Sequence, residues 1–564
     1  MFLSEIIIEN YRAILRSRLS FSSSTIIIGE NETGKSSIFE ALQVILSPVL
    51  GESFPKLSAF HFHHSDEKRG IAGPIRFLLR FKEKSKGEWE GPAYDRIAEL
   101  FSGEIKGKRK LEFEFQASLL KNGETKINWN IGSPNTGIYS SDAKYLYWLR
   151  HINPVIYLSA GMLTGHGYAD ITAHHKSPVF SSLSMDVQRL VECILDCSRD
   201  IISDRSTDIS RDIEKGYAAS VELIERVGSD VSTGEFGLSR KIQELIGKQG
   251  IDERANLAPV LSGPGSTAHR LGVLLLVAAL LRAGTMELME DMDPIWIIEN
   301  PEANVHPMTL SSITALLNAI KGQKIVSTFS GIVSNSVPLQ QVRRLTRFEG
   351  IVKEYRINDK KFSREDLRRI GYHLQTQHRM AIFARMWLLV EGESEFWILP
   401  QLARLLNYDF ELEGIVCMDF AQSGISPIIK MAEEMGIEWH LLADGDEAGG
   451  SYISAAKKHM SINDPKKRFT KLDFIDIEHL FWYSGYSDVY YKHARVLPKN
   501  EHDARPTWVI QKAIKNYPKP YLALSIVKAA AEPDSPGVPE TLRDMIKYCI
   551  ELARNAPANA YSKL

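Results

Sequence analysis

Five acidic residues in the last third of the chain have the types and spacing of a divalent-metal site. Glu391 and Glu395 follow the apolar run LLV, Asp444 and Asp446 follow LLA, and Glu478 lies in the segment FIDIEHLF. If the apolar runs are neighbouring parallel strands, their carboxyl ends share one sheet edge, where α/β proteins place their sites. Carboxylates this close repel unless cations neutralise them, and oxygen ligands favour Mg²⁺ or Mn²⁺. We therefore predict two metal ions here, suited to phosphodiester hydrolysis.

A second constellation near the N-terminus has the chemistry of nucleotide binding. Residues 29–36 read GENETGKS, which fits G-x-x-x-x-G-K-[ST] between a β-branched run and an amphipathic segment. The glycines let main-chain N–H groups surround a triphosphate, and the helix N-terminus adds partial positive charge. Lys35 would bridge the β- and γ-phosphates of ATP, and Ser36 would hold one Mg²⁺. The residues predicted to bind ATP from this loop are Gly29, Asn31, Gly34, Lys35, Ser36 and Ser37.

Two further segments complete this constellation. Four apolar residues lead into Glu299, as in a Walker B strand, so Glu299 is the second predicted ligand of the ATP-bound Mg²⁺. The segment 261–266 (LSGPGS) looks like the signature loop of ABC-type ATPases, in which Ser262 and Gly263 would cap the γ-phosphate of ATP held by the opposite subunit. The order of phosphate loop, long insertion, signature and acid is similar to that of SMC proteins. This resemblance implies a head-to-head dimer with two ATP molecules between the subunits.

Two positions depart from the ABC pattern. The residue after the Walker B acid is normally a glutamate that polarises the attacking water, but here it is Asn300, and an amide has no useful basicity. The position of the switch histidine is Phe329, which cannot relay a proton. We expect ATP to be bound well and hydrolysed slowly. Glu302 is our candidate for a substitute base, and it is also a predicted residue of the nucleotide site.

The elements that must position these residues follow from hydrophobic patterning. The N-terminal motif reads as strand, loop and helix, and residues 73–130 alternate around an Asn-Gly turn as antiparallel hairpins do. Residues 186–250 show apolar spacings of three and four that predict an inserted helical segment, either packed on the body or acting as a dimerisation arm. A new α/β pattern begins at residue 293, and a polar stretch at 358–369 marks a domain boundary.

The acidic motifs in this order resemble the Toprim fold of topoisomerases, primases and certain nucleases. An SMC-like ATPase followed by Toprim is the arrangement of the OLD (overcoming lysogenization defect) family of nucleases, and the resemblance covers essentially the whole chain. It implies metal-dependent DNA cleavage with Glu391, Glu395, Asp444, Asp446 and Glu478 as ligands. It also implies a late lysine that stabilises charge at the scissile phosphate. The K-P-x-x-A stretch makes Lys519 our candidate, with Lys528 as the alternative.

We therefore expect an α/β chain that combines an ABC-type ATPase domain, interrupted by a helical dimerisation segment, with a Toprim domain built on a central, mostly parallel sheet. The expected domains are an ATPase N-terminal lobe at 1–185, a helical insertion at 186–250, an ATPase C-terminal lobe at 251–370 and a Toprim domain at 380–564. The resemblance implies DNA as substrate and a homodimer or tetramer. It also implies a role in anti-phage defence, in some relatives beside a helicase or a retron reverse transcriptase with its DNA.

Composition limits the class of protein. The 564 residues are 44% hydrophobic and 24% charged, which excludes wholesale disorder and a coiled-coil rod. With 68 Lys+Arg against 70 Asp+Glu, the chain is not a polycation, so DNA must be bound by local basic patches. The longest apolar run, at 271–281, is shorter than the roughly 20 residues of a spanning helix. Four scattered cysteines suit a reducing compartment, so we expect a cytoplasmic protein without a membrane partner.

Two other functions fit the same motifs. The first is an SMC-like, DNA-binding ATPase whose Toprim domain does not cut. The second is a primase-like nucleotidyl transferase, which would incorporate nucleotides and would not hydrolyse DNA.

Overall fold

The computed structural model divides the chain into two compact units. One comprises residues 1–337 and 341–354, and the other comprises residues 338–340 and 355–564. The structure describes residues 1–47, 53–65, 70–102, 107–159, 293–303, 322–376, 378–421, 423–460, 464, 466–496 and 506–556, together with five single residues between 160 and 321. Apart from three of these single residues, the predicted helical insertion at 186–250 lies outside the described residues, as does the signature loop with Ser262 and Gly263.

A 12-stranded sheet forms the first unit. In order across the sheet the strands are β10 (Val155–Ser159), β11 (Ile295–Glu299), β12 (Gln323–Ser327), β3 (Ser24–Ile28), β13 (Val342–Phe348), β14 (Ile351–Tyr355), β2 (Ile14–Ser20), β1 (Phe2–Tyr11), β6 (Ile75–Lys82), β7 (Lys110–Leu119), β8 (Thr125–Ser133) and β9 (Ile138–Ser140). The strands from β10 to β13 that surround β3 pair in parallel. The strands β2, β1, β6, β7, β8 and β9 pair antiparallel.

The two halves of this sheet follow from their sequences. Strand β3 ends in the apolar run 26–28 and β11 begins with the apolar run 295–298, as expected of parallel strands that are covered on both faces. In β7 the buried and exposed residues alternate, which is typical of an antiparallel strand with one solvated face. The predicted hairpins at 73–130 are confirmed, since β6 pairs with β7 and β7 with β8.

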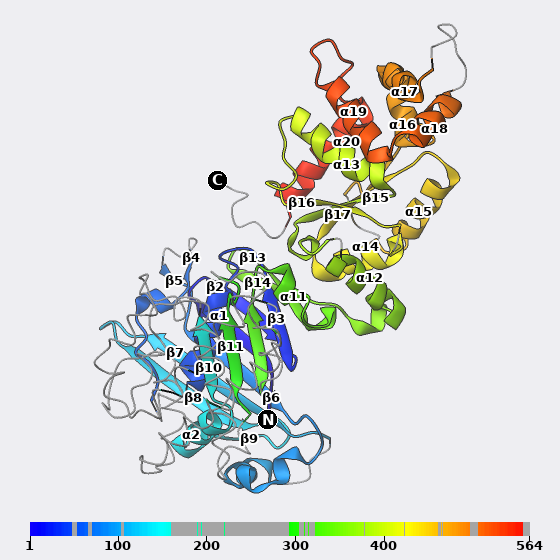
Figure 1. The fold of residues 1–564 in the computed structure, drawn as a ribbon. Helices are drawn as coiled ribbons and strands as arrows, with labels where there is room; N and C mark the ends of the chain where they lie inside the picture. The colour runs from blue at the N-terminus through cyan, green and yellow to red at the C-terminus, as the bar shows by residue number, and fades with distance from the viewer. Residues whose placement is uncertain are drawn as a thin grey trace. The chain divides into compact units, whose positions relative to one another are not determined.

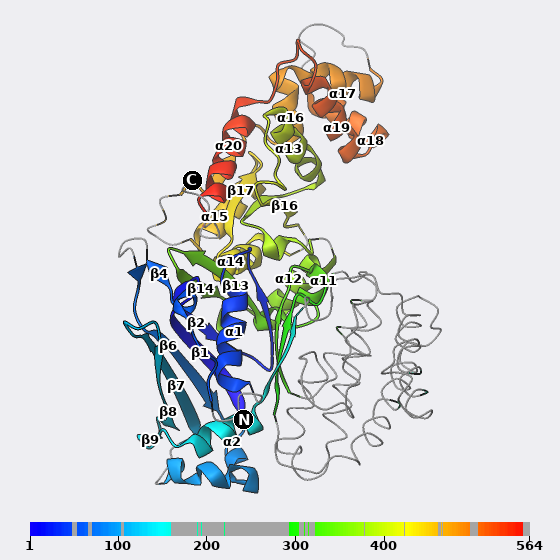
Figure 2. The same cartoon turned by 90° about the vertical axis from the view of Figure 1, so that its left-hand side faces the viewer.

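Helix α1 (Lys35–Leu46) begins directly after the phosphate loop and lies within the curve of the sheet (Figure 2). Its apolar face, which includes Ile38, Leu42 and Ile45, belongs to one buried cluster with side chains of β1, β6 and β7. The unit is completed by η2 (Ala59–His61), β4 (His64–Ser65), β5 (Gly70–Ile71), η3 (Glu88–Glu90), η4 (Pro92–Phe101), α2 (Ala143–Ile152) and α11 (Gly331–Ser334).

The second unit is built on a four-stranded sheet in the order β16 (Ile415–Asp419), β15 (Met386–Val390), β17 (Glu438–Ala443) and β18 (Phe469–Lys471). All three strand pairs are parallel. Figure 1 shows helices on both faces of this sheet. The helices are α12 (Arg364–Thr376), α13 (Glu393–Leu405), α14 (Ile425–Met435), α15 (Glu447–Lys457), α16 (Ile477–Phe481), α17 (Ser487–Ala494), α18 (Pro506–Asn516), α19 (Lys519–Ala530) and α20 (Glu540–Arg554), with the short segments η6 (Leu339–Gln341), η7 (Asp359–Lys361), η8 (Ala381–Phe383) and η9 (Trp482–Tyr486).

Successive side chains of a strand point to opposite faces of the sheet, and both faces of this sheet are apolar, so both need a layer of helices. Met386, Leu388 and Val390 of β15 belong to a core cluster with α13, α19 and α20, while the intervening Trp387 and Leu389 are also fully buried. A strand that is buried on both faces reads as an uninterrupted apolar run, as MWLLV does.

The expected fold class is thus confirmed: a phosphate-loop unit with a mixed sheet precedes an α/β unit with a parallel sheet. Within the described part of the chain, no helix combines the length and apolar character needed to cross a membrane.

Candidate functional site

The acids of the second unit are delivered by the carboxyl ends of its strands. Glu391 follows the last residue of β15, and Asp444 follows the last residue of β17, which pairs with β15. Glu395 lies in the first turn of α13, and Asp446 is the N-cap of α15, where its carboxylate accepts a hydrogen bond from the main-chain N–H of Gly449 at 2.7 Å. Parallel strands thus bring four of the five predicted acids to one edge of the sheet.

Glu478 and Lys519 join this edge through direct contacts. The hydroxyl of Ser394 donates a hydrogen bond to Glu478 Oε1 at 2.7 Å, which ties the α16 acid to the first turn of α13. The ammonium of Lys519 lies 3.5 Å from the same oxygen. Lys519 begins α19, a helix that packs along α13. Side chains separated by more than a hundred residues of sequence therefore meet in one cluster.

The carboxylates perturb one another strongly. Burial, followed by the negative charges of Glu395 and Glu391, raises the pKa of Asp444 to about 8. Burial, with Glu478 as the largest charge contribution, raises the pKa of Glu395 to about 7, and the nearby Lys519 partly opposes this shift. Burial and the charge of Asp446 likewise raise the pKa of Glu391. Carboxyl groups that share a site hold protons when no cation compensates their charge.

The donor set fits divalent cations. The oxygen Oε2 of Glu391 is buried and has no hydrogen-bond partner among the described residues, although the other oxygen, Oε1, accepts a hydrogen bond from Tyr452 at 3.4 Å. A buried carboxylate oxygen without a donor is costly, and a cation ligand would satisfy it. Glu395 and Glu478 are 5% and 6% exposed, so their charges also need compensation inside the protein. These are all oxygen donors, which Mg²⁺ and Mn²⁺ prefer.

Three residues of this site escaped the sequence reasoning. Tyr452 lies on α15 and carries no motif that marks it, and Ser394 sits inside the acidic motif but was not assigned a role. Gly445 shows a clearer signal, since it stands between two acids. A Cβ at Gly445 would lie 2.2 Å from the carbonyl oxygen of Phe474, so only glycine allows the loop after β17 to approach the loop after β18.

Residues of the first unit that were predicted to bind nucleotide also meet. Ser36 donates a hydrogen bond to Oε1 of Glu299, and Tyr157 of β10 donates one to the other oxygen of the same carboxylate. Glu299 ends β11, which is separated from the phosphate-loop strand β3 by β12. A hydroxyl and a carboxylate in contact at this point are the pair expected to hold a nucleotide-bound Mg²⁺. Tyr157 was not predicted, because nothing in its sequence neighbourhood marks it.

The lysine of the phosphate loop is held in place by main-chain carbonyl oxygens of the same loop. Lys35 donates to the carbonyl oxygens of Gly29 and Glu30, both at 2.7 Å. Burial lowers the pKa of Lys35 to about 8, against the opposing charges of Glu299 and Glu30. The Phe329 ring centroid lies 4.7 Å from the ammonium, a cation–π contact. The loop itself requires glycine at residue 29, where a Cβ would lie 2.7 Å from the carbonyl oxygen of Leu345.

The two departures from the ABC pattern have a structural setting. Both oxygens of Glu302 accept hydrogen bonds, from the hydroxyl of Thr328 at 2.9 Å and from the main-chain N–H of Phe329 at 2.6 Å. Asn300 has a positive φ of 49°, and its Oδ1 is buried with no hydrogen-bond partner among the described residues. Glu302 is therefore engaged as an acceptor, while Asn300 offers an unused acceptor beside the phosphate loop.

A cavity of about 290 Å³ lies over this loop. Its lining includes predicted residues and five that the sequence did not assign to ATP binding: Ala13, Glu32, Asn300, Phe329 and Arg347. The predicted residues in the lining are Asn31, Gly34, Lys35, Ser36, Ser37 and Glu299. Arg347 lies on β13, and one of its guanidinium nitrogens is 3.8 Å from a carboxylate oxygen of Glu32. It brings a second positive charge to the cavity wall, which no local motif could have revealed.

Comparison with known proteins identifies both units. Residues 1–381 match the family model described as "Protein of unknown function (DUF2813)", and residues 382–446 match the "Overcoming lysogenization defect protein-like, TOPRIM domain". The chain is 29% identical over 575 residues to "Uncharacterized protein YbjD" of Escherichia coli (strain K12), and the match covers 98% of this chain and 99% of that protein.

Among solved structures, the C-terminal region of the Burkholderia pseudomallei OLD protein matches with a TM-score of 0.26 and 18% identity, over 30% of this chain and 99% of that one. The SMC head domain from Thermotoga maritima matches with a TM-score of 0.31 and 14% identity, over 64% of this chain and 100% of that one. The family model of the first unit spans more than half of the sequence. The chain therefore belongs to the DUF2813 family, and its second unit carries an OLD-like Toprim domain.

Proposed function

We propose that this protein is an ATP-regulated, divalent-metal-dependent DNA endonuclease. The observation that carries the proposal is the cluster of Glu391, Glu395, Asp444 and Glu478 with Lys519 in an OLD-like Toprim domain. Such a cluster holds several negative charges and one positive charge at a sheet edge. That charge distribution suits cations and the phosphate of a nucleic acid together.

Each residue has a defined part in the proposed reaction. When bound, two divalent ions would activate the attacking water and stabilise the leaving oxygen of the phosphodiester. Glu391, Glu395, Asp444, Asp446 and Glu478 would hold these ions as ligands. Ser394 fixes the carboxylate of Glu478 by its hydrogen bond, and Lys519, beside that carboxylate, would neutralise charge on the scissile phosphate.

The phosphate-loop unit would regulate this activity by binding ATP with one Mg²⁺. The contact of Ser36 with Glu299 and the position of Lys35 support binding. Asn300 supplies no base, and both oxygens of Glu302 are engaged, so we propose that hydrolysis is slow and that the bound nucleotide acts as a clamp. Ser262 and Gly263 of a second subunit would complete the site in a dimer.

A plasmid-cleavage assay tests the nuclease proposal. Purified protein is incubated with supercoiled and linear DNA, with and without Mn²⁺ or Mg²⁺ and with and without ATP. We expect metal-dependent nicking that Asp444→Ala abolishes and Lys519→Ala reduces. Lys528→Ala distinguishes the two candidate lysines and should cut as the wild type does, because Lys528 lies exposed in the last turn of the same helix and Lys519 contacts Glu478. Equal cleavage by wild type and Asp444→Ala would remove the nuclease proposal, and incorporation of labelled nucleotides would favour a primase-like enzyme.

We further propose that the cleavage serves anti-phage defence, on the basis of the resemblance to OLD proteins. Bacteria that express the wild-type chain or Asp444→Ala are challenged with a panel of phages. Reduced plaque formation with the wild type alone is the expected result. Equal plating on both strains across the panel would argue against this role.

A further inference from the structure

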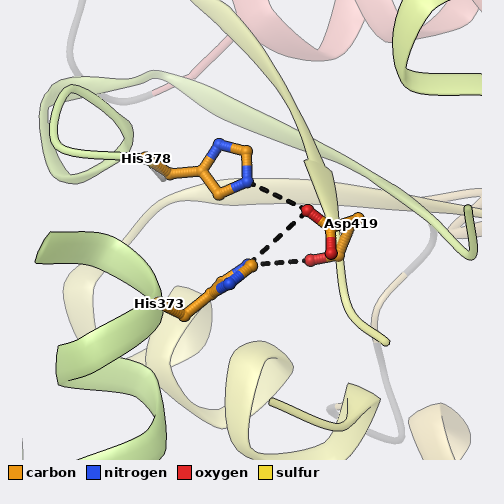
Figure 3. Close-up of side chains that lie close together, drawn as sticks. All are labelled: His373, His378 and Asp419. Carbon is orange, nitrogen blue, oxygen red and sulfur yellow. Dashed lines mark hydrogen bonds and ion pairs between the residues drawn. The ribbon is translucent and has the colours of Figure 1, made fainter. Parts of the chain in front are cut away.

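A second cluster of metal-type ligands lies in the Toprim unit, outside the five acids. It consists of His373 on α12, His378 in the turn after α12, and Asp419 at the end of β16. One potential ligand atom from each residue lies within 4.8 Å of the other two. Figure 3 shows both imidazole rings directed at Asp419, one from helix α12 and one from the turn that follows it.

The potential ligand atoms of this cluster lie near the spacing of ligands around a shared ion, and two of the contacts between them are hydrogen bonds. His378 Nε2 lies 3.2 Å from Asp419 Oδ1, and His373 Nε2 lies 2.8 Å from the main-chain oxygen of Asp419. His373 Nε2 is 4.0 Å from the same Oδ1. Ligand atoms at about 2.0–2.1 Å from one ion lie roughly 3 Å apart, so small movements would complete the coordination.

Burial and access both favour a bound ion. His373 is 2% and His378 8% exposed, so the imidazole nitrogens are withdrawn from water. The side chain of Asp419 keeps 25% of its surface exposed, which leaves a route for an ion. The ring of His378 also packs edge-on against Phe396 of α13, at 5.9 Å between centroids, which restricts its orientation.

The ligand types select the class of ion. Two imidazoles and one carboxylate suit borderline transition ions such as Zn²⁺, whereas Mg²⁺ prefers oxygen ligands alone. Three protein ligands would leave positions for water or for the main-chain oxygen of Asp419. The all-oxygen cluster at Glu391 has the opposite preference. The two clusters of this domain would therefore select different ions.

The cluster is adjacent to the nuclease carboxylates within the same sheet. Asp419 is in register with Val390, the residue before Glu391. Phe420, the next residue after Asp419, packs edge-on against Tyr452, whose hydroxyl donates to Glu391. We propose that His373, His378 and Asp419 form a transition-metal site, with Zn²⁺ as its preferred ion, that fixes α12 and the end of β16 beside the nuclease carboxylates.

Metal binding to the full chain tests this site directly. Chelator-stripped protein is titrated with Zn²⁺ in excess Mg²⁺, which occupies oxygen-rich sites, and bound zinc is measured by elemental mass spectrometry after dialysis. We expect one Zn²⁺ per chain in the wild type and in Asp444→Asn, and at least about 100-fold weaker binding in His378→Ala and Asp419→Asn. Asp419→Asn keeps the size and one acceptor oxygen of the side chain, so it is the variant expected to fold normally.

His459→Ala is the matched control, because His459 lies in the same unit and outside the cluster. It should bind zinc as the wild type does. Co²⁺ provides a second readout, since its visible absorption should appear on binding to the wild type and be absent in Asp419→Asn. The site is overturned if the wild type binds no zinc under these conditions, or if both ligand variants bind zinc as tightly as the wild type.

Discussion

At the scale of single residues, Asn300 is the position where this chain differs most clearly from an efficient ATPase. Its Oδ1 is a buried acceptor that can orient a water molecule but cannot remove a proton from it. Glu302, the other candidate, already accepts two hydrogen bonds. Binding without rapid turnover is the expected consequence of this pair.

Asn300→Glu should therefore increase the rate of ATP hydrolysis. A general base contributes about 10²–10⁴-fold in well-positioned sites, so we expect at least about a tenfold increase in phosphate release. Asn300→Gln is the control of similar size without a base. An Asn300→Glu turnover equal to that of the wild type would show that the missing base does not limit hydrolysis.

Asp444 illustrates the conflict between stability and function at one residue. Burial and the neighbouring acids raise its pKa to about 8, which shows that its charge is unfavourable without metal. Asp444→Asn should abolish cleavage and raise the Tm of the metal-free chain, by a few degrees if it contributes about 1 kcal/mol. Added Mg²⁺ should raise the Tm of the wild type more than that of the variant. Thermal scans in EDTA would contradict this account if the variant melted earlier.

At the scale of elements, the start of α15 shows how closely the main chain approaches the site. A Cβ at Gly449 would lie 2.1 Å from the carbonyl oxygen of Asp444, whereas at Gly450 the nearest atom is the flexible Lys471 ammonium at 3.8 Å. The two glycines are neighbours on the same helix, so they share helix propensity and differ in this contact.

Gly449→Ala should displace Asp444 and reduce metal-dependent cleavage, by about 100-fold if the shift approaches 1 Å. Gly450→Ala should leave cleavage unchanged and stabilise the helix slightly, because alanine is the better helix former. Kinetics of plasmid nicking for the two variants make the comparison. Equal losses in both would indicate a general effect on α15.

Strand β17 carries a buried histidine whose ionisation links the fold to pH. Burial, with smaller contributions from Lys467 and Arg468, lowers the pKa of His440 to about 3. In the unfolded chain the same group takes up a proton near pH 6.5. Below that pH the unfolded state therefore binds more protons, and stability is lost as the pH falls from 6.5 toward 3.

His440→Gln removes this proton linkage. Its destabilisation relative to the wild type should be largest at pH 7 and should shrink by about 2 kcal/mol at pH 5. Urea unfolding at the two pH values, followed by tryptophan fluorescence, measures the difference. If the difference in unfolding free energy between variant and wild type stayed constant with pH, a group other than His440 would be responsible for the acid sensitivity.

At the scale of the whole molecule, the resemblance to ABC ATPases implies that Ser262 of a second chain lies over the γ-phosphate of an ATP bound in the cavity beside Lys35. ATP with Mg²⁺ should therefore convert the protein to a dimer or a higher assembly. Lys35→Ala and Ser262→Arg should prevent the change, and Lys56→Ala, at an exposed position outside the cavity, should not.

Sedimentation velocity with and without nucleotide measures this assembly. An ATP-independent dimer would contradict the proposal that bound ATP clamps two subunits together. A Lys35→Ala protein that dimerises with ATP as the wild type does would also contradict it. The same samples distinguish a dimer from a tetramer.

The sequence predicted those features of the molecule that depend on residues close together along the chain. The phosphate loop, the acid of β11 and the acids after β15 and β17 could be found because each follows a continuous apolar run, and such runs indicate buried parallel strands. The hairpin of β7 and β8 was readable from alternation around Asn122-Gly123. The match of residues 382–446 to the Toprim model agrees with the motifs at Glu391 and Asp444.

Only the tertiary structure decided which side chains meet across the strands. Tyr157 beside Glu299, Ser394 beside Glu478 and Tyr452 beside Glu391 join residues that are 142, 84 and 61 positions apart. The same holds for His373 and His378, which reach Asp419 from another segment. The spacing of residues along the sequence indicates only the periodicity within a single helix or strand. Neighbours across a sheet are set by strand order and loop path, and these become visible only when the strands are paired.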